Sequence, residues 1–122
     1  MNLVQIAQHA DDLTRAASFY ERLLGQKPIA TFDPPGLVFF RIGTTRLLLD
    51  RAAPTALLYI GVDDVRTRTD ELAAEGVTIN TPPHVIFTHE DDLLGPAGHD
   101  EWQAFINDSE GNLVGLVSHH AT

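Results

Sequence analysis

The 122-residue chain contains no cysteine, one tryptophan and one methionine, and it has only 8 basic residues against 17 acidic ones. Without cysteine there is no disulfide, no thiolate metal site and no cysteine nucleophile. The formal net charge of -9 disfavours nucleic acid and anionic membranes as partners, because both are negatively charged. The chemistry open to the protein is therefore that of histidine, carboxylate and hydroxyl groups.

Long apolar runs are also missing. The longest near-apolar stretch, AAPTALLYIGV, is well short of the roughly 18 residues that indicate a membrane span. The start, MNLVQIAQHADD, lacks the basic and apolar parts of a secretory signal, so we expect a cytoplasmic protein. A hydrophobic content of 43% in a chain of this length predicts one compact domain over residues 1–122.

The order of predicted elements occurs twice. The strand-like NLVQIAQHA precedes an amphipathic helix in DDLTRAASFYERLLG, and the strand-like runs PIATFD, GLVFFRIG and TTRLLLD follow. The second half repeats this order with TALLYIGV, the helical DDVRTRTDELAAEG, and the strands VTINTPPHVIF, EWQAFIN and GNLVGLV. Such a repeat predicts two βαβββ modules that share a core, at about residues 1–52 and 53–122.

This pattern resembles the vicinal oxygen chelate superfamily, which includes glyoxalase I, methylmalonyl-CoA epimerase, extradiol dioxygenases and the bleomycin resistance proteins. The most specific parts are QIAQHADDLTRAASFYERLLG in the first module and the FxxDxxGN pattern of AFINDSEGNLVGLV in the second. The resemblance implies an α+β fold in which the two modules form a curved mixed sheet. The sheet would make a cup for a small molecule, commonly within a homodimer.

The resemblance also implies where a metal would bind. In metal-using members the first and last strands of each module supply four ligands, and these positions correspond here to Gln5, Leu48, Leu57 and Gly115. Only Gln5 has a ligand atom, and a lone amide does not hold a divalent cation against water. A shift of one residue would bring Asp50 nearer but would still leave the fourth ligand missing. We therefore predict that the protein has no metal and no other cofactor.

The alternation of side chains along strands predicts what lines the cup instead. The floor would be mostly apolar and would suit a hydrophobic or aromatic ligand, although ordinary core packing of a curved sheet explains the same pattern. Gly115 would leave space for the ligand, or would mark a bulge or a close contact with a neighbour. The residues predicted to contact a ligand are Gln5, Ala7, Leu48, Asp50, Leu57, Tyr59, Trp102 and Gly115.

The segment THEDDLLGPAGHDE has neither helical nor strand periodicity and is predicted to be a loop. Its His89 and His99, with nearby His84 and the carboxylates between residues 90 and 101, could form a relocated metal site or an acid–base pair. The alternative is a solvated, mobile loop. Trp102, directly after this loop, would either stack on a flat ligand or pack between the layers. The pair His119 and His120 is expected to fray at the C-terminus.

Three functions follow from these patterns. The first is a metal-independent binding protein that holds a small apolar or aromatic compound, with the acidic charge favouring a cationic one. The second is a lyase, isomerase or dioxygenase-type enzyme that uses His9 or His99 as a base, or a relocated metal site. The third is an interaction module, which would need an exposed apolar patch and no open pocket.

Overall fold

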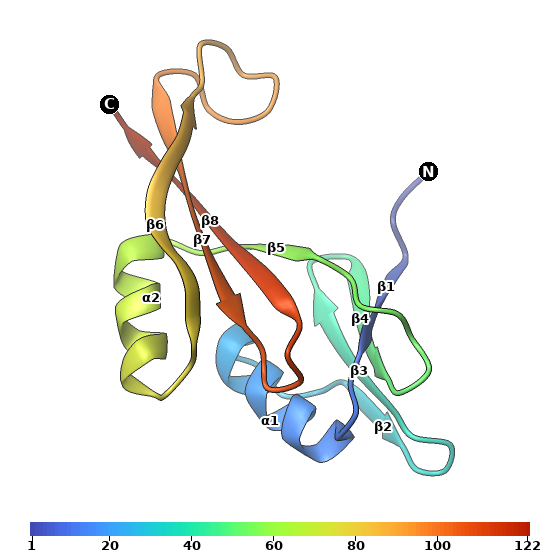
Figure 1. Ribbon diagram of the computed structural model, residues 1–122. Helices are drawn as coiled ribbons and strands as arrows, with labels where there is room; N and C mark the ends of the chain where they lie inside the picture. Colours follow the sequence, from blue (N-terminus) through green and yellow to red (C-terminus); the bar gives the residue numbers. More distant parts are fainter. The chain divides into compact units, whose positions relative to one another are not determined.

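A computed structural model describes residues 1–122 as two compact units, each with one helix and four strands (Figure 1). Unit 1 comprises Met1–Ala56 and Asp108–Asn112, and unit 2 comprises Leu57–Asn107 and Leu113–Thr122. The predicted α+β fold with two sets of βαβββ elements is confirmed. The prediction of one domain over residues 1–122, with two modules that meet near residue 52, stays a prediction.

Unit 1 has its strands in the spatial order β1-β4-β3-β2, with β1 parallel to β4 and the other pairs antiparallel. Its helix begins after Asp12, whose side chain accepts a hydrogen bond from the N–H of Arg15 at 3.0 Å, and it ends at Gly25, which has a φ of 68°. The elements are β1 (Gln5–His9), α1 (Leu13–Leu24), β2 (Ala30–Phe32), β3 (Leu37–Ile42) and β4 (Thr45–Asp50).

The core of unit 1 lies between α1 and one face of its sheet. Tyr20 of α1 packs against Phe40 of β3, and Leu47 and Leu49 of β4 are also fully or almost fully buried. Because side chains alternate along a strand, the residues between these lie on the opposite face, which α1 does not cover. We call it the open face of unit 1; it carries Gln5, Ala7, Phe39, Arg46 and Leu48.

Unit 2 repeats this arrangement with the strand order β5-β8-β7-β6 and with β5 parallel to β8. The side chain of Asp64 caps its helix by accepting from the N–H of Arg66 at 2.9 Å, and Gly76 follows the helix with a φ of 90°. Neither helix of the protein is long and apolar enough to cross a membrane. The elements are β5 (Leu58–Gly61), α2 (Val65–Ala74), β6 (Ile79–Thr88), β7 (His99–Asn107) and β8 (Leu113–Ala121).

The helix α2 lies along β6, β7 and β8 and covers one face of this sheet (Figure 1). Ala104, Ile106, Val114 and Leu116 are fully buried beneath it. The opposite side, the open face of unit 2, carries the alternating residues of the same strands. They are Glu101, Gln103 and Phe105 of β7, Gly115, Val117 and His119 of β8, and Tyr59 of β5.

The end of β8 differs from the prediction. His119 and His120 do not fray, because β7 begins at His99 and gives both residues a partner: Glu101 lies opposite His119, and Asp100 lies opposite His120. The strand pair therefore continues to Ala121, beyond the expected end of the sheet. The loop between β6 and β7 is shorter than the predicted THEDDLLGPAGHDE segment and extends from His89 to Gly98, because Thr88 ends β6 and His99, Asp100 and Glu101 begin β7.

Candidate functional site

The FxxDxxGN segment forms a tight turn around the buried carboxylate of Asp108. Its Oδ1 accepts hydrogen bonds from the backbone N–H groups of Glu110 and Asn112, both at 2.8 Å. Its Oδ2 accepts from the Tyr20 hydroxyl at 2.6 Å and from the Asn112 amide at 2.8 Å. Burial raises the pKa of Tyr20, so the phenol stays protonated and donates. The segment thus has a structural role, which is to join the turn to α1.

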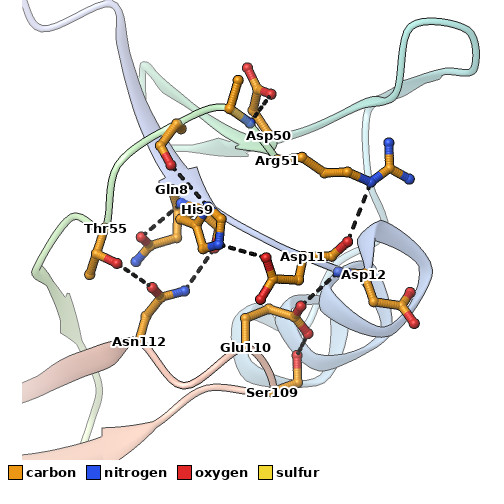
Figure 2. A network of polar contacts seen from close by, with 12 residues as sticks. Gln8, His9, Asp11, Asp12, Asp50, Arg51, Thr55, Ser109, Glu110 and Asn112 are labelled. Atoms are coloured by element: carbon orange, nitrogen blue, oxygen red, sulfur yellow. Dashed lines mark hydrogen bonds and ion pairs between the residues drawn. The ribbon is translucent and has the colours of Figure 1, made fainter.

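The same turn is tied to the start of α1 and the end of β1, as Figure 2 shows. The carboxylate of Glu110 accepts from the backbone N–H of Asp12 at 2.8 Å and from the Arg15 guanidinium at 2.7 and 3.0 Å. The Asn112 amide donates to the backbone oxygen of His9 at 2.8 Å. The residues that carried the family resemblance therefore hold these segments of unit 1 together.

Glu110 gives unit 1 a pH-dependent stability. The Arg15 guanidinium lowers the pKa of Glu110 from 4.5 to about 2, against the opposing effect of burial. A lowered folded-state pKa stabilises the fold above about pH 4.5, and this stabilisation is lost as the pH falls toward about 2. Glu110→Gln is expected to lower the free energy of unfolding by about 1–2 kcal/mol at neutral pH and to reduce its pH dependence in this window.

Urea unfolding of both proteins at steps from neutral to about pH 2 measures this difference. Glu90→Gln, which changes an exposed carboxylate of the β6–β7 loop, is the matched control and should leave stability unchanged. Parallel pH profiles for wild type and Glu110→Gln would contradict the role given to the ion pair.

On the open face of unit 2, two histidines meet one carboxylate. The Nε2 atoms of His89 and His119 each lie 3.0 Å from Oε1 of Glu101, and the three ligand atoms lie within 4.8 Å of one another. The side chains are 2%, 31% and 11% exposed for His89, His119 and Glu101. We call this set the His–Glu–His cluster. It brings together two predicted loop residues and one histidine that was expected to fray.

The other oxygen of Glu101 is also held. The amide nitrogen of Gln103 donates to Oε2 at 2.7 Å, so both carboxylate oxygens have partners. Burial alone would raise the pKa of Glu101, but the hydrogen bonds from Gln103, His119 and His89 outweigh it and lower the pKa. The cluster therefore presents an ionised carboxylate at neutral pH.

The open face of unit 1 is built around a different contact. Gln5 lies opposite Arg46 in the β1–β4 register, and the Arg46 guanidinium donates to the amide oxygen of Gln5 at 3.0 Å. Leu48 lies opposite Ala7 instead and is buried. Asp50 closes the strand, where its side chain accepts from the N–H of Ala52 at 2.9 Å. The amide of Gln5 is thus occupied by a cationic side chain.

The absence of a side chain at Gly115 is explained by a neighbouring aromatic ring. Tyr59 lies opposite it in the β5–β8 register, and a Cβ on Gly115 would lie 2.8 Å from the Tyr59 ring and 3.2 Å from the Phe105 ring. The two rings meet edge to face, with centroids 5.8 Å apart. The space predicted for a ligand is therefore filled by Tyr59, which is the close-contact alternative. Leu57 precedes β5 and is not the residue that faces Gly115.

The family model described as Glyoxalase/Bleomycin resistance protein/Dioxygenase superfamily matches residues 2–116. The chain belongs to this superfamily. The resemblance inferred from the sequence is thereby confirmed, and the match spans both units of the structure.

Solved structures of the superfamily's fold resemble the chain over nearly its whole length. The antibiotic-binding protein TnmS3 from a Streptomyces species has a TM-score of 0.72 and 21% identity, with 95% of this chain and 93% of that one covered. Lactoylglutathione lyase from Agrobacterium tumefaciens has a TM-score of 0.66 and 24% identity, with 95% and 92% covered. A glyoxalase I mutant from Zea mays has a TM-score of 0.71 and 18% identity, with 99% of this chain and 45% of that one covered. No curated protein matches the sequence.

The superfamily's metal positions do not fit a metal in this chain. Gln5 faces the positive charge of Arg46, and Leu48 and Leu57 have no ligand atoms. Gly115 faces Tyr59, whose ring covers it. A divalent cation at Gln5 would meet a like charge, and Leu48, Leu57 and Gly115 each offer no carboxylate or imidazole ligand.

The two histidines predicted as bases are both engaged elsewhere. Nδ1 of His9 lies 3.0 Å from the Ala53 oxygen, and Nε2 lies 2.9 Å from the Asp11 carboxylate. Burial lowers the pKa of His9, but these hydrogen bonds outweigh it and raise the pKa. Nδ1 of His99 lies 3.0 Å from the Ala97 oxygen, and His99 is not part of the His–Glu–His cluster. With both ring nitrogens of His9 facing acceptors, the geometry does not favour this residue as a base.

Trp102 lies on the other face of the unit 2 sheet from the cluster. The guanidinium of Arg66 sits 4.5 Å from its ring centroid, and the His120 ring is 6.5 Å away. The alternation of side chains explains this, because the neighbours Glu101 and Gln103 both point to the open face. The structure places Trp102 beside α2, which agrees with the packing alternative and not with a ligand contact on the open face.

A pocket of about 290 Å³ in unit 1 lies between α1 and the β2–β3 hairpin. Leu13, Ala17 and Val38 form apolar parts of its wall, and Arg51 adds a charge. None of the residues predicted to contact a ligand lines this pocket. It is therefore a separate feature from the open faces.

Proposed function

We propose that the protein binds a small apolar or aromatic molecule on the open face of unit 2, without a metal at the superfamily's usual positions. The observation that carries this proposal is the pair of Tyr59 and Phe105. Tyr59 is 53% exposed, yet its ring is held edge to face on Phe105 by the sheet. An accessible, pre-positioned aromatic surface suits stacking with a flat ligand at little cost in conformational entropy.

Charge and similarity support the same class of ligand. The formal net charge of -9 attracts cationic compounds and repels nucleic acid and anionic membranes. One structural relative is an antibiotic-binding protein, and the superfamily's name includes bleomycin resistance. A homodimer is part of the proposal, because two-fold dimers are the commonest oligomers of soluble proteins and would bury an apolar face of the sheets. A cytoplasmic location is also part of the proposal. Sedimentation at micromolar concentration decides the oligomeric state.

The Tyr59 proposal predicts the effect of removing its ring. Bleomycin and a panel of cationic aromatic antibiotics are titrated into the wild type by calorimetry, and Tyr59→Ala is expected to weaken any binding by at least about tenfold, or ~1.4 kcal/mol. The matched control is Phe32→Ala, which removes a similarly exposed aromatic ring that lines the pocket of unit 1. Loss of binding in Phe32→Ala with full binding in Tyr59→Ala would move the site to that pocket and reject the proposal.

The second candidate function is a lyase, isomerase or dioxygenase-type enzyme. The His–Glu–His cluster favours it, because imidazole and carboxylate groups on one open face are the ligands and proton carriers that such chemistry uses. Lactoylglutathione lyase turnover with added divalent metal is the direct assay. Turnover that disappears in His119→Gln would favour the enzyme over a binding protein.

A further inference from the structure

The His–Glu–His cluster lies apart from the superfamily's metal positions. His119 is on β8, four residues beyond Gly115 and on the same face, and Glu101 is its direct partner on β7. His89 comes from the first residue of the β6–β7 loop. We propose that these three side chains bind one divalent transition-metal ion of the Zn²⁺ class. This departs from the predicted absence of metal, which was drawn from the superfamily's positions.

The donor set matches such an ion. Two imidazoles and one carboxylate are ligands for Zn²⁺ and for related first-row metals, whereas Mg²⁺ and Ca²⁺ prefer oxygen alone. Metal–ligand bonds of about 2.0–2.1 Å in a tetrahedron place donor atoms about 3.3 Å apart. Each histidine Nε2 already lies 3.0 Å from the carboxylate oxygen. Binding requires each Nε2 proton to leave for Nδ1 or for solvent, after which small shifts of side chains admit the ion and a fourth position stays open for water or a ligand.

The electrostatics of the cluster favour a cation. The Glu101 carboxylate is nearly buried and faces two histidines, which are hydrogen-bonding partners without a fixed positive charge. A buried carboxylate is stabilised best by a cation beside it, and a divalent ion provides one. Gln103 holds the second carboxylate oxygen, which orients the first toward the histidines.

Gly95 in the loop supplies an independent observation. A Cβ at this position would lie 2.8 Å from Nε2 of His89 and 3.0 Å from Nε2 of His119. Its backbone is not in the left-handed region, so space rather than conformation explains the glycine. The loop is held over the cluster by ordered contacts, such as the bond from the Gly98 N–H to the His89 oxygen at 2.8 Å. Glycine thus keeps the space beside both nitrogen donors free.

The test measures metal binding directly. Protein stripped with a chelator is titrated with ZnCl₂ by calorimetry and with CoCl₂ by visible absorption, which reports tetrahedral coordination. We expect one ion per chain, with micromolar or tighter affinity, and a melting temperature that rises with Zn²⁺ concentration. His119→Gln should weaken Zn²⁺ binding by more than about tenfold. His84→Ala is the control, because His84 is bonded to the Pro82 oxygen and lies outside the cluster.

A second variant, at Gly95, tests the metal site without removing a metal ligand. Gly95→Ala should also weaken Zn²⁺ binding, because its methyl group would crowd both nitrogen donors. His119 is chosen over His89 because it is partly exposed, and circular dichroism confirms that each variant is folded. No Zn²⁺ binding by the wild type at about 100 μM, or wild-type affinity in either variant, would overturn the proposal. Tyr59→Ala should bind Zn²⁺ normally, so failure here is distinguishable from failure of the aromatic site.

Discussion

Asp108→Ala is expected to lower the free energy of unfolding by about 3–5 kcal/mol. Its carboxylate accepts four hydrogen bonds inside unit 1, and the substitution leaves the buried Tyr20 hydroxyl and the Asn112 amide without this acceptor. An unsatisfied buried donor is destabilising by about 1–3 kcal/mol. Urea unfolding followed by circular dichroism measures the loss.

Two further variants separate the contributions to this effect. Tyr20→Phe removes only the phenolic donor and should lower stability by about 1–1.5 kcal/mol. Asp91→Ala removes an exposed loop carboxylate that accepts from the Leu93 N–H, and it should change stability by less than about 0.5 kcal/mol. Equal losses in Asp108→Ala and Tyr20→Phe would show that the hydrogen bonds within the turn contribute nothing.

The sequence predicted the fold because its signals are local. Asp12 and Asp64 precede helices whose first N–H groups need acceptors, and Gly25 supplies a left-handed C-terminal residue. The alternating runs predicted the strands, and the repetition of their order pointed to the superfamily. The caps and the alternation depend on neighbours within a few residues, and the repeat is visible along the sequence, so none of these signals required knowledge of the tertiary structure.

The contacts of the candidate sites depend on strand register, which the sequence alone left open. Arg46 beside Gln5 and Tyr59 beside Gly115 are cross-strand neighbours far apart in the chain. His119 was missed because the end of β8 is set by where β7 begins. Its signal was present, however, since it shares the alternation of Gly115 along one strand.

The same alternation could have placed Trp102. Trp102 alternates with the same period as Ala104 and Ile106, so these three residues share one face of β7, and the last two have the apolar character of residues beneath a helix. Glu101 and Gln103 share the other face. The prediction left two alternatives open for Trp102, stacking on a flat ligand or packing between the layers, because it did not use this pattern. Side-chain alternation was therefore the more reliable guide to which face a residue occupies.

Gly115→Glu is expected to destabilise the protein by about 2–4 kcal/mol and to abolish binding of the aromatic ligand. The new Cβ would lie 2.8 Å from the Tyr59 ring, and the carboxylate would be placed against two aromatic rings without a partner. Gly115→Ala should be milder, at about 1 kcal/mol, because Tyr59 is half exposed and its ring can move outward. Urea unfolding and calorimetric titration of the same samples measure both effects.

Gly61→Ala is the matched control, since it lies in the same parallel strand pair and a Cβ there would meet no atom within 4 Å. It should leave stability unchanged or raise it by about 0.4–1 kcal/mol, because alanine restricts the unfolded chain. If the Tyr59 ring is what Gly115 accommodates, Tyr59→Ala should remove most of the destabilisation by Gly115→Ala in a double-mutant cycle. If Gly115→Ala leaves the free energy of unfolding unchanged and shows no coupling energy with Tyr59→Ala, the space above this glycine is open. A ligand rather than the tyrosine ring is then its natural occupant.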